Sequence, residues 1–360
     1  MPRSDLARAE SGAGLDRDKA GVCRHPAEQC RRLFSARDYI SGDVFSVVRC
    51  ERCGLALTMP APSPHRMDRH YPAAYYGVES RYSTLLARCL SLLYRARARR
   101  IERRAGTRAG VVLDVGCGRG ELLGELRRRG WRTIGTERNA AAAAYARDAL
   151  GLDVRAAAPR ELGLPPGSVD VVVLWHVLEH VPDPAGLLAE VSGLLRPGGL
   201  ALIAVPDFGS PEARLGGPSW FHLDVPRHLN HFDGLALRRL LTAAGLEPIA
   251  TDRAALEYDL FSFVQTVLNR LGVRHNLLYN LIRSRGARVL GGAAGDWSRT
   301  DLLLTVVLAP LIGTAGLPWL MVAPVMGLSA TQATYARRAG PRDSDKESGH
   351  PDADSNNGSG

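Results

Sequence analysis

Residues 111–120 read Val-Val-Leu-Asp-Val-Gly-Cys-Gly-Arg-Gly, and this stretch decides the fold. Five mostly apolar, β-branched residues predict a buried strand, and the glycines after them predict a sharp turn. Residues 121–126 then have the apolar spacing of a helix. A strand, a glycine turn and a helix predict the first unit of a parallel α/β sheet, with a ligand close to the turn and to the unpaired N–H groups of the helix start.

The spacing of the glycines indicates which ligand the turn accepts. A dinucleotide turn has the pattern Gly-x-Gly-x-x-Gly, whereas here the third glycine, Gly120, comes one residue early and Glu121 follows it. A carboxylate at the mouth of the turn is unfavourable beside a pyrophosphate. Asp114 adds a second acid just inside the end of the strand. We therefore expect a cationic or zwitterionic ligand.

Asp114 and the glycines after it resemble the first motif of the class I S-adenosylmethionine (SAM) methyltransferases. The resemblance implies that Asp114 lies near the methionine end of SAM. The turn residues that would lie under the ligand are Gly116, Cys117, Gly118 and Gly120. Residues 131–137 predict a second strand ending in Glu137, whose carboxylate can accept both ribose hydroxyls. The alternative for Glu137 is an ordinary surface acid.

Strands and helices alternate from residue 110 to residue 250, which predicts a parallel sheet with ligands at the carboxyl ends of its strands. A buried strand over 169–175 ends at Trp175, and residues 176–184 closely resemble the post-strand motif of small-molecule methyltransferases. The resemblance implies that Trp175 and His176 contact SAM. We predict a Rossmann-like, doubly wound, mostly parallel sheet of seven strands in a methyltransferase domain over residues 106–255.

Residues 220–232 form a loop dense in polar and aromatic side chains, at the position where the family keeps its acceptor cover. Methyl transfer to a hydroxyl needs alignment and a proton acceptor, because the sulfonium already carries the activation. Histidine suits this role near neutral pH. The candidate catalytic bases are His228, His231, His176 and His180. For any one of them the alternative is a structural histidine that hydrogen-bonds the loop.

The N-terminal part contains four cysteines with metal-ligand character. Cys50 and Cys53 form a C-x-x-C pair after an alternating strand at 43–49, an arrangement that aims two thiolates at one metal. The upstream pair, Cys23 and Cys30, is irregular because six residues separate its members. The set resembles the zinc-binding module ahead of many bacterial methyltransferases, and we predict a zinc-ribbon-like module over residues 21–79 with these four ligands. The alternative is a degenerate knuckle with buried thiols.

Residues 80–105 predict a basic amphipathic helix, with leucines at one end and six arginines at the other. It either packs on the catalytic domain or offers a patch to anionic lipid headgroups. The net charge of +9, from 46 Lys+Arg and 37 Asp+Glu, fits nucleic acid, an anionic membrane or a composition rich in arginine. The charged N-terminus has no apolar core and is not a signal peptide, and the cysteine pattern favours a reducing compartment.

Residues 302–336 contain no charged side chain. The run exceeds the roughly 20 residues of one bilayer span but is too short for two, and prolines and glycines interrupt its middle. Arginines flank it on both sides, and positive residues mark the cytoplasmic side. We predict a membrane-associated apolar hairpin over residues 301–338; a single span and a soluble helix pair are the alternatives. A helical extension at 256–300 precedes it, and residues 1–20 and 339–360 are expected to be disordered.

These patterns predict a SAM-dependent methyltransferase that O-methylates a hydrophobic or lipid-linked small molecule at the cytoplasmic face of a membrane; a purely cytoplasmic location is the alternative. Two other functions stay open. An RNA methyltransferase would explain the charge and the cysteines, but the apolar run and the lack of an Asn/Asp-Pro-Pro-aromatic motif argue against a nucleic-acid partner. A non-catalytic, membrane-associated SAM-binding protein would need the glycine turn alone.

Overall fold

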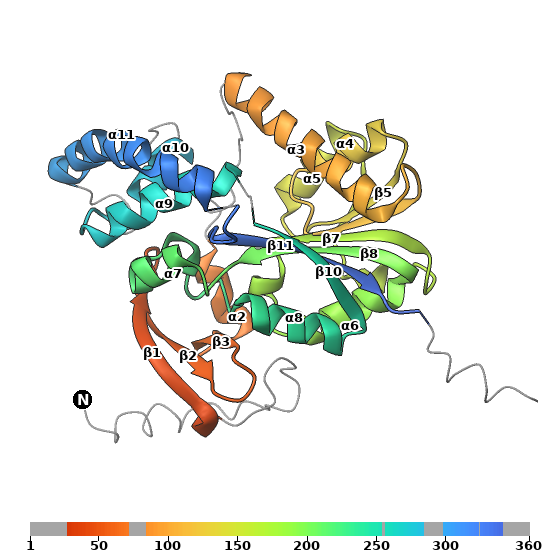
Figure 1. Ribbon diagram of the computed structural model, residues 1–360, viewed down its shortest axis with the longest axis horizontal. Helices are drawn as coiled ribbons and strands as arrows, with labels where there is room; N and C mark the ends of the chain where they lie inside the picture. Colours follow the sequence, from red (N-terminus) through yellow and green to blue (C-terminus); the bar gives the residue numbers. More distant parts are fainter. Residues whose placement is uncertain (1–26, 72–83, 254–255, 284–297, 324, 341–360) are drawn as a thin grey trace, which may run out of the picture.

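The computed structural model describes residues 27–71, 84–253, 256–283, 298–323 and 325–340 (Figure 1). The strands of its main sheet are β4 (Val111–Val115), β5 (Arg132–Thr136), β6 (Asp153–Arg155), β7 (Val169–Trp175), β8 (Leu195–Pro206), β10 (Leu246–Asp252) and β11 (Thr331–Arg338). These seven strands have the order β10-β11-β8-β7-β4-β5-β6. β11 runs antiparallel to both of its neighbours, β10 and β8, and every other pair of strands in this sheet is parallel. The predicted doubly wound, mostly parallel sheet is confirmed.

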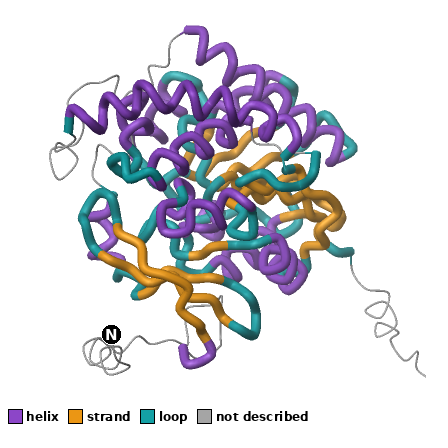
Figure 2. The backbone as a smooth tube through the Cα atoms, turned by 60° about the vertical axis from the view of Figure 1, so that its left-hand side comes forward, coloured by secondary structure: helices purple, strands orange, loops and turns teal. Residues whose placement is uncertain are grey.

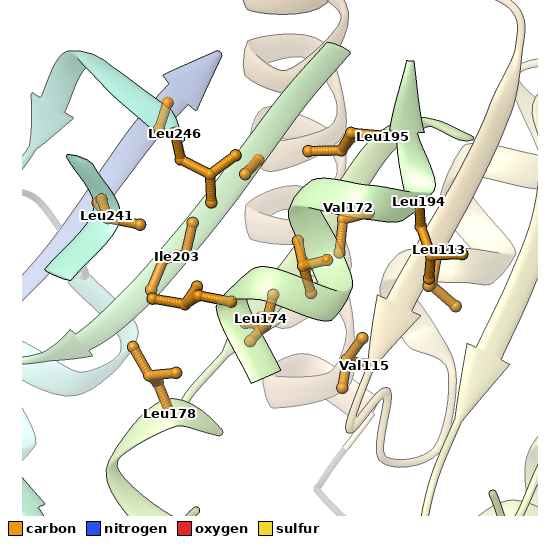
Figure 3. Close-up of a cluster of buried hydrophobic side chains, with 14 of the residues drawn as sticks. Leu113, Val115, Val172, Leu174, Leu178, Leu194, Leu195, Ile203, Leu241 and Leu246 are labelled. Atoms are coloured by element: carbon orange, nitrogen blue, oxygen red, sulfur yellow. The ribbon is translucent and has the colours of Figure 1, made fainter. Parts of the chain in front are cut away.

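Helices cover both faces of this sheet (Figure 1). One face carries α3 (Thr84–Ala105), α4 (Glu121–Arg128) and α5 (Ala140–Asp148), and the other carries α6 (Pro184–Leu194) and α8 (Gly234–Ala243). Figure 3 shows the second layer, where Leu113, Leu174 and Ile203 of the sheet meet side chains of the helices. Covered faces explain why the central strands are continuous apolar runs rather than alternating ones.

The arginine-rich helix α3 packs on the catalytic domain. Ala98 and Ile101 are fully buried in the same core cluster as residues of α4 and β8. Arg104 lies 3.6 Å from a carboxylate oxygen of Asp252 and 5.2 Å from the ring centre of Tyr335. The packed interpretation of residues 80–105 therefore describes this helix better than the headgroup patch.

The N-terminal strands are joined to the predicted acceptor loop. β1 (Cys30–Arg37), β2 (Val44–Cys50) and β3 (Ala56–Met59) form an antiparallel sheet with β9 (Asn230–His231), in the order β1-β2-β3-β9. Figure 2 shows this second sheet below the helical layer. Because β9 belongs to the loop 220–232, the N-terminal module forms one side of that loop.

Arg227 fastens this module to the loop. Its fully buried guanidinium donates to Asp38 Oδ1 at 2.9 Å, to Asp224 Oδ1 at 2.7 Å and to the His70 carbonyl at 3.0 Å. Asp38 follows β1, whereas Asp224 and Arg227 belong to the loop. Charges removed from water need such partners, so this group fixes the module against the loop.

The predicted apolar hairpin is wrong. Residues 299–322 form one helix, α11 (Arg299–Val322), which continues through Pro310 and Pro318, and the end of the uncharged run is β11 of the main sheet. A lipid-facing helix and a strand buried in a sheet both lack charges, so composition did not separate them. The sheet consequently takes its last strand from beyond residue 255, and α9 (Leu256–Arg270), α10 (Leu277–Arg283) and α11 are inserted between β10 and β11. The termini expected to be disordered lie almost wholly outside the described residues.

A buried carboxyl attaches this insertion to the domain. Glu212, in α7 (Pro211–Gly216), is 6% exposed and accepts hydrogen bonds from Trp220 Nε1 (3.2 Å), Thr266 Oγ1 (3.0 Å) and Ser262 Oγ (3.1 Å). Burial raises the pKa of Glu212 to about 8, although these hydrogen bonds oppose the shift. Ser262 and Thr266 belong to α9 and Trp220 to the acceptor loop, so one side chain links the insertion to the loop.

The raised pKa of Glu212 predicts a pH-dependent stability. A glutamate in an unfolded chain has a pKa of about 4.3, so between about pH 4 and pH 8 the folded protein holds one more proton at this site. The free energy of unfolding therefore falls as pH rises through this window, by on the order of 5 kcal/mol. Denaturant titrations across the window should show that the free energy of unfolding depends less on pH in Glu212→Gln than in the parent protein. The exposed Glu247→Gln should have the same pH dependence as the parent. Parallel curves for Glu212→Gln and the parent protein would contradict the assignment.

Candidate active site

The glycine turn after β4 is held open towards solvent. Gly116 and Cys117 donate their N–H groups to the Thr136 carbonyl at 2.8 and 2.9 Å. Gly116 and Gly118 have φ of 72° and 57°, in the region that favours glycine. A Cβ on Gly116 would lie 2.6 Å from Val177 Cγ2, whereas a Cβ on Gly118 would meet nothing within 4 Å. The turn is therefore packed from the β7 side and accessible to a ligand at Gly118.

Asp114 lies beneath this turn. It is 4% exposed, and burial raises the pKa of its carboxyl to about 7; Arg97 opposes the shift, and Glu137 and Glu121 add to it. The Arg97 guanidinium of α3 lies 3.2 Å from the centre of the Trp175 ring. The turn thus has an acid on one side and a cation on the other, which suits a ligand with both an ammonium and a carboxylate group.

Glu137 follows β5, as expected, and is fixed by two backbone groups. Its Oε2 accepts the Gly118 N–H at 2.9 Å and its Oε1 accepts the Asn139 N–H at 2.6 Å. Each carboxylate oxygen has a second lone pair available to a hydroxyl. Cys117, in contrast, is buried, and burial raises the pKa of its thiol, so only its backbone can serve a ligand.

His176 and Glu179 form a pair beyond the end of β7. The Nδ1 of His176 lies 2.9 Å from Oε1 of Glu179, which is 1% exposed. Burial disfavours the charge of Glu179, but the hydrogen bond with His176 and the nearby histidines outweigh it and lower the pKa of Glu179 to about 2. The ionised carboxylate orients the imidazole so that Nδ1 carries a proton and Nε2 can accept one. His176 also has φ of 54°, a strained conformation of the kind found at functional sites.

His222 of the acceptor loop covers His176. The two rings are stacked, with centres 6.2 Å apart and planes 6° from parallel. Burial lowers the pKa of His222 to about 3, so this ring is neutral near physiological pH. The buried His222 ring therefore packs as a neutral aromatic group against the His176–Glu179 pair.

Glu179, His180 and His228 could together hold a metal ion, because one ligand atom from each lies within 4.8 Å of the others. The Nδ1 atoms of His180 and His228 donate to the carbonyls of Arg227 (3.0 Å) and His222 (2.8 Å), which leaves lone pairs on both Nε2 atoms. Within the described part of the chain, Glu179 Oε2 is buried without a hydrogen-bond partner. Two imidazoles and a carboxylate suit a divalent cation, and the same groups also brace the loop.

His231 has a different position. Thr58 donates its hydroxyl to the His228 carbonyl at 2.7 Å, and His231 Nε2 donates to the same hydroxyl oxygen at 2.9 Å. Its backbone pairs with Ala56 in the N-terminal sheet. The ring of His231 thus holds the module against the loop, and the geometry places His176 rather than His231 beside the glycine turn.

Three of the four predicted zinc ligands are described. Cys30 lies opposite Cys50 in the β1–β2 pair, and Cys53 lies in the turn that follows β2. Cys23 lies outside the described residues.

A cavity of about 590 Å³ lies further along the same edge of the sheet, beyond β8. It contains none of the predicted site residues. Its charged and polar lining includes Asp207, Arg214, Asp233, Arg238, Arg253 and Gln332. Asp207 is paired with Arg253, and Asp233 is paired with Arg49 at 3.2 Å. Part of the charge of the cavity lining is therefore already balanced.

Comparison with known proteins agrees with this geometry. A family described as a methyltransferase domain matches residues 86–251. A ubiquinone biosynthesis O-methyltransferase of Bordetella bronchiseptica is 30% identical over 189 residues, which cover 49% of this chain and 77% of that protein. This chain belongs to the class I SAM-dependent methyltransferases. The region of this methyltransferase that matches the family ends within β10. The insertion and β11 therefore lie outside the matched region.

Other relatives of the methyltransferase are matched over part of their length. A Mycolicibacterium smegmatis protein named as a probable S-adenosylmethionine-dependent methyltransferase is 34% identical over 51% of this chain and 66% of its own length. A ubiquinone biosynthesis O-methyltransferase of Pseudomonas paraeruginosa is 36% identical over 29% of this chain and 47% of its own. The chain thus spans about half to two thirds of the length of these relatives. A solved SAM-dependent methyltransferase from Archaeoglobus fulgidus has 20% identity and a TM-score of 0.41, covering 69% of this chain and 94% of that one.

Sequence reasoning missed three side chains at the site of this methyltransferase. Arg97 is one of seven arginines in α3, and only the packing of that helix shows which one reaches Trp175. Glu179 follows His176 at the spacing of one helical turn, a signal that could have paired them. His222 carried no distinguishing signal within a loop rich in histidine.

Proposed function

We propose that this methyltransferase transfers a methyl group from SAM to a hydroxyl of a hydrophobic or lipid-linked small molecule at the cytoplasmic face of a membrane. The observation that supports this most is the position of the His176–Glu179 pair. Val177, between them, packs against Gly116, so a proton acceptor stands beside the turn expected to hold the cofactor. Two relatives named ubiquinone biosynthesis O-methyltransferase fit a hydroxyl acceptor.

The groups around the turn fit SAM. Glu137 would accept the ribose hydroxyls, and Gly118 leaves room for the ligand against the backbone. Asp114 would meet the ammonium group, and Arg97 would leave the Trp175 ring to pair with the carboxylate. The remaining turn contacts would come from the backbone of Gly116, Cys117 and Gly120.

SAM supplies a methyl group that its sulfonium has already activated. The chain needs to align the acceptor hydroxyl and take its proton. His176 Nε2 would take this proton as the oxygen–carbon bond forms and the carbon–sulfur bond breaks, leaving a methyl ether and S-adenosylhomocysteine. Glu179 would stabilise the imidazolium that results. His180 and His228 would brace the loop over the acceptor.

The acceptor class follows from the surroundings of this pair. The loop over His176 is aromatic: the rings of Phe221 and His222 meet edge to face, with their centres 5.1 Å apart. A quinone-like ring, a polyketide-type product or a lipid-linked sugar would each present a hydroxyl on an apolar body. We favour the quinone-like ring, because an aromatic loop around His176 fits it and because of the names of the relatives.

Asp114→Asn should weaken SAM binding on the order of 100-fold, because the ammonium loses a buried charged partner. Since the pKa of Asp114 in the free protein is about 7, SAM affinity of the parent protein should also rise by about tenfold from pH 6 to pH 8, as the carboxylate ionises. Calorimetric titrations of the parent, Asp114→Asn and the exposed-acid control Asp153→Asn would measure both effects. Equal affinity for the parent and Asp114→Asn would remove the cofactor assignment.

We also propose a structural zinc ion on Cys23, Cys30, Cys50 and Cys53. The register of Cys30 with Cys50 and the turn position of Cys53 support it. Metal analysis of the purified protein should find about one zinc per chain, and Cys50→Ser with Cys53→Ser should lose it. If the parent protein contains no metal and is no more stable than the double variant, the degenerate knuckle is supported instead.

The acceptor itself can be found in cells. Mass spectrometry of lipids and small metabolites from cells that lack the protein should reveal a species lighter by one methyl group, restored by the parent gene but not by Glu179→Gln. Restoration by Glu179→Gln would instead favour a non-catalytic SAM-binding protein.

A further inference from the structure

The outer face of α11 is an exposed apolar stripe. Large side chains recur along it at intervals of four residues, with one interval of six, and this spacing keeps them on one helical face. They are Leu303 (63% exposed), Val307 (49%), Leu311 (62%), Leu317 (50%) and Met321 (78%), followed by Val325 (88%) just beyond the helix. Over Arg299–Trp319 the helix has the length and composition to cross a bilayer. Only 11% of its most apolar window is buried against the rest of the protein. Such a stripe marks an interaction surface.

The inner face of α11 is firmly packed. Ile312 and Leu308 contact the cluster that contains Val264 and Leu268 of α9. A Cβ on Gly316 would lie 2.8 Å from the Phe263 ring, so α9 and α11 approach closely. Figure 1 shows α9, α10 and α11 as a layer beside the main sheet. The exposed stripe therefore belongs to a rigid layer and not to a helix detached from the domain.

The connections of the insertion exclude a single crossing of a membrane. β10 leads into the insertion and β11 leads out of it, and the two strands are paired, with Asp252 opposite Ala333. Both ends of the insertion therefore lie on the same side of any membrane, and the chain between them must cross an even number of times. Within the described residues only α11 has the length and composition for a crossing.

The rest of the insertion, as far as the structure describes it, offers no return crossing. The 15 residues of α9 extend about 22 Å, short of the roughly 30 Å hydrocarbon layer. Its inner face carries buried polar side chains: Asn269 donates to the Ser219 carbonyl of the domain, and Gln265 accepts the Tyr279 N–H of α10. The segment 284–297 is shorter than the roughly 20 residues that a helical span needs.

We propose that α11 lies in the plane of the membrane interface, with the stripe from Leu303 to Val325 in the acyl–headgroup boundary of an anionic bilayer. This deepens the proposed function by stating how the protein meets its membrane. Charge supports a lipid occupant: Arg299 is exposed at the start of α11 and Arg270 at the end of α9, and the Arg274 N–H, four residues after Arg270, bonds Asp301 of α11 at 3.1 Å. The one hydroxyl along the stripe, Thr314, already donates to the Pro310 carbonyl, so the stripe needs no hydrogen-bonding partner.

Vesicle flotation with the full-length protein tests the surface. Vesicles of phosphatidylglycerol and phosphatidylcholine should carry the parent protein, and Leu311→Glu should weaken binding by about tenfold or more. Leu235→Glu on α8, a leucine of similar exposure (58% against 62%), is the matched control and should bind as the parent does. Deleting residues 302–336 is unsuitable because it removes β11 from the main sheet. Equal binding of parent and Leu311→Glu would overturn the proposal.

Depth measurements test the orientation. Tryptophan placed at Leu303, Leu311 or Met321 should be quenched to a similar extent by lipids brominated at a shallow acyl position, because an in-plane helix holds all three at one depth. Strong quenching at Leu311 alone by deeply brominated lipids would indicate insertion along the helix axis and overturn the proposal. A lipid-free dimer that Leu311→Glu dissociates would assign the stripe to a second copy instead. SAM titration of the same samples without vesicles separates a failure of docking from a failure of the cofactor site.

Discussion

Arg227→Met should lower the free energy of unfolding by about 3–5 kcal/mol, because it leaves two buried carboxylates without their cation. Asp38 and Arg227 have no exposed side-chain surface, and Asp224 is 13% exposed. Burial disfavours the charge on both aspartates, but Arg227 and the other hydrogen bonds and positive groups around them together outweigh it and lower the pKa of each. The stability from this group is present above about pH 4 and is lost as pH falls through the lowered pKa values.

Denaturant titration would measure this loss. Arg160→Met is the matched control, because its 3.0 Å pair with Glu190 involves an Arg160 side chain that is 66% exposed, and we expect a loss below about 1 kcal/mol. Adding Asp38→Asn to Arg227→Met should recover part of the stability, since one unpaired charge is removed. A loss in Arg227→Met no larger than that in the control would show that the buried network does not hold the module in place.

Glu179→Gln should lower kcat on the order of 100-fold, and His176→Ala on the order of 100- to 10,000-fold, the usual contribution of a general base. The amide cannot stabilise the imidazolium of His176 as a carboxylate does. SAM affinity should change little, because neither side chain holds the cofactor through a charge. Single-turnover rates with a hydroxyl acceptor, together with SAM titrations, would separate the two effects.

The pH dependence gives a second readout for this pair. A general base gives kcat of the parent protein a pH-dependent limb, and His176→Ala should remove that limb. His231→Gln is the matched control, because its ring is bonded to Thr58 away from the turn. Its kcat should follow the pH profile of the parent. A His176→Ala variant with an unchanged profile would transfer the role of base to another group.

Local patterns along the chain predicted much of this methyltransferase. The run Val111–Gly120 predicted a strand and turn whose backbone must come close to a ligand, and the structure has β4 and a turn open at Gly118. Glu137 and His176 follow the ends of β5 and β7, where an α/β sheet collects its ligand groups. These features depend on residues near one another in sequence, so composition and spacing were enough.

Pairings between distant segments could not be predicted in the same way. The uncharged residues 331–336 satisfied a membrane pattern equally well, and only their pairing with β8 and β10 makes them a strand. The partner of Arg227, Asp38, is 189 residues away along the chain. No local spacing encodes such a contact.

The sequence by itself determined the class of the sheet, the glycine turn and the acids beneath and beside it, because each follows from neighbouring residues and the geometry of one strand or turn. Only the tertiary structure decided that the last strand comes from beyond the insertion, that Arg97 reaches Trp175, and that the N-terminal strands close one side of the acceptor loop. The physical reason is that burial and pairing select among distant partners, and an apolar or charged residue alone does not state which partner it will have.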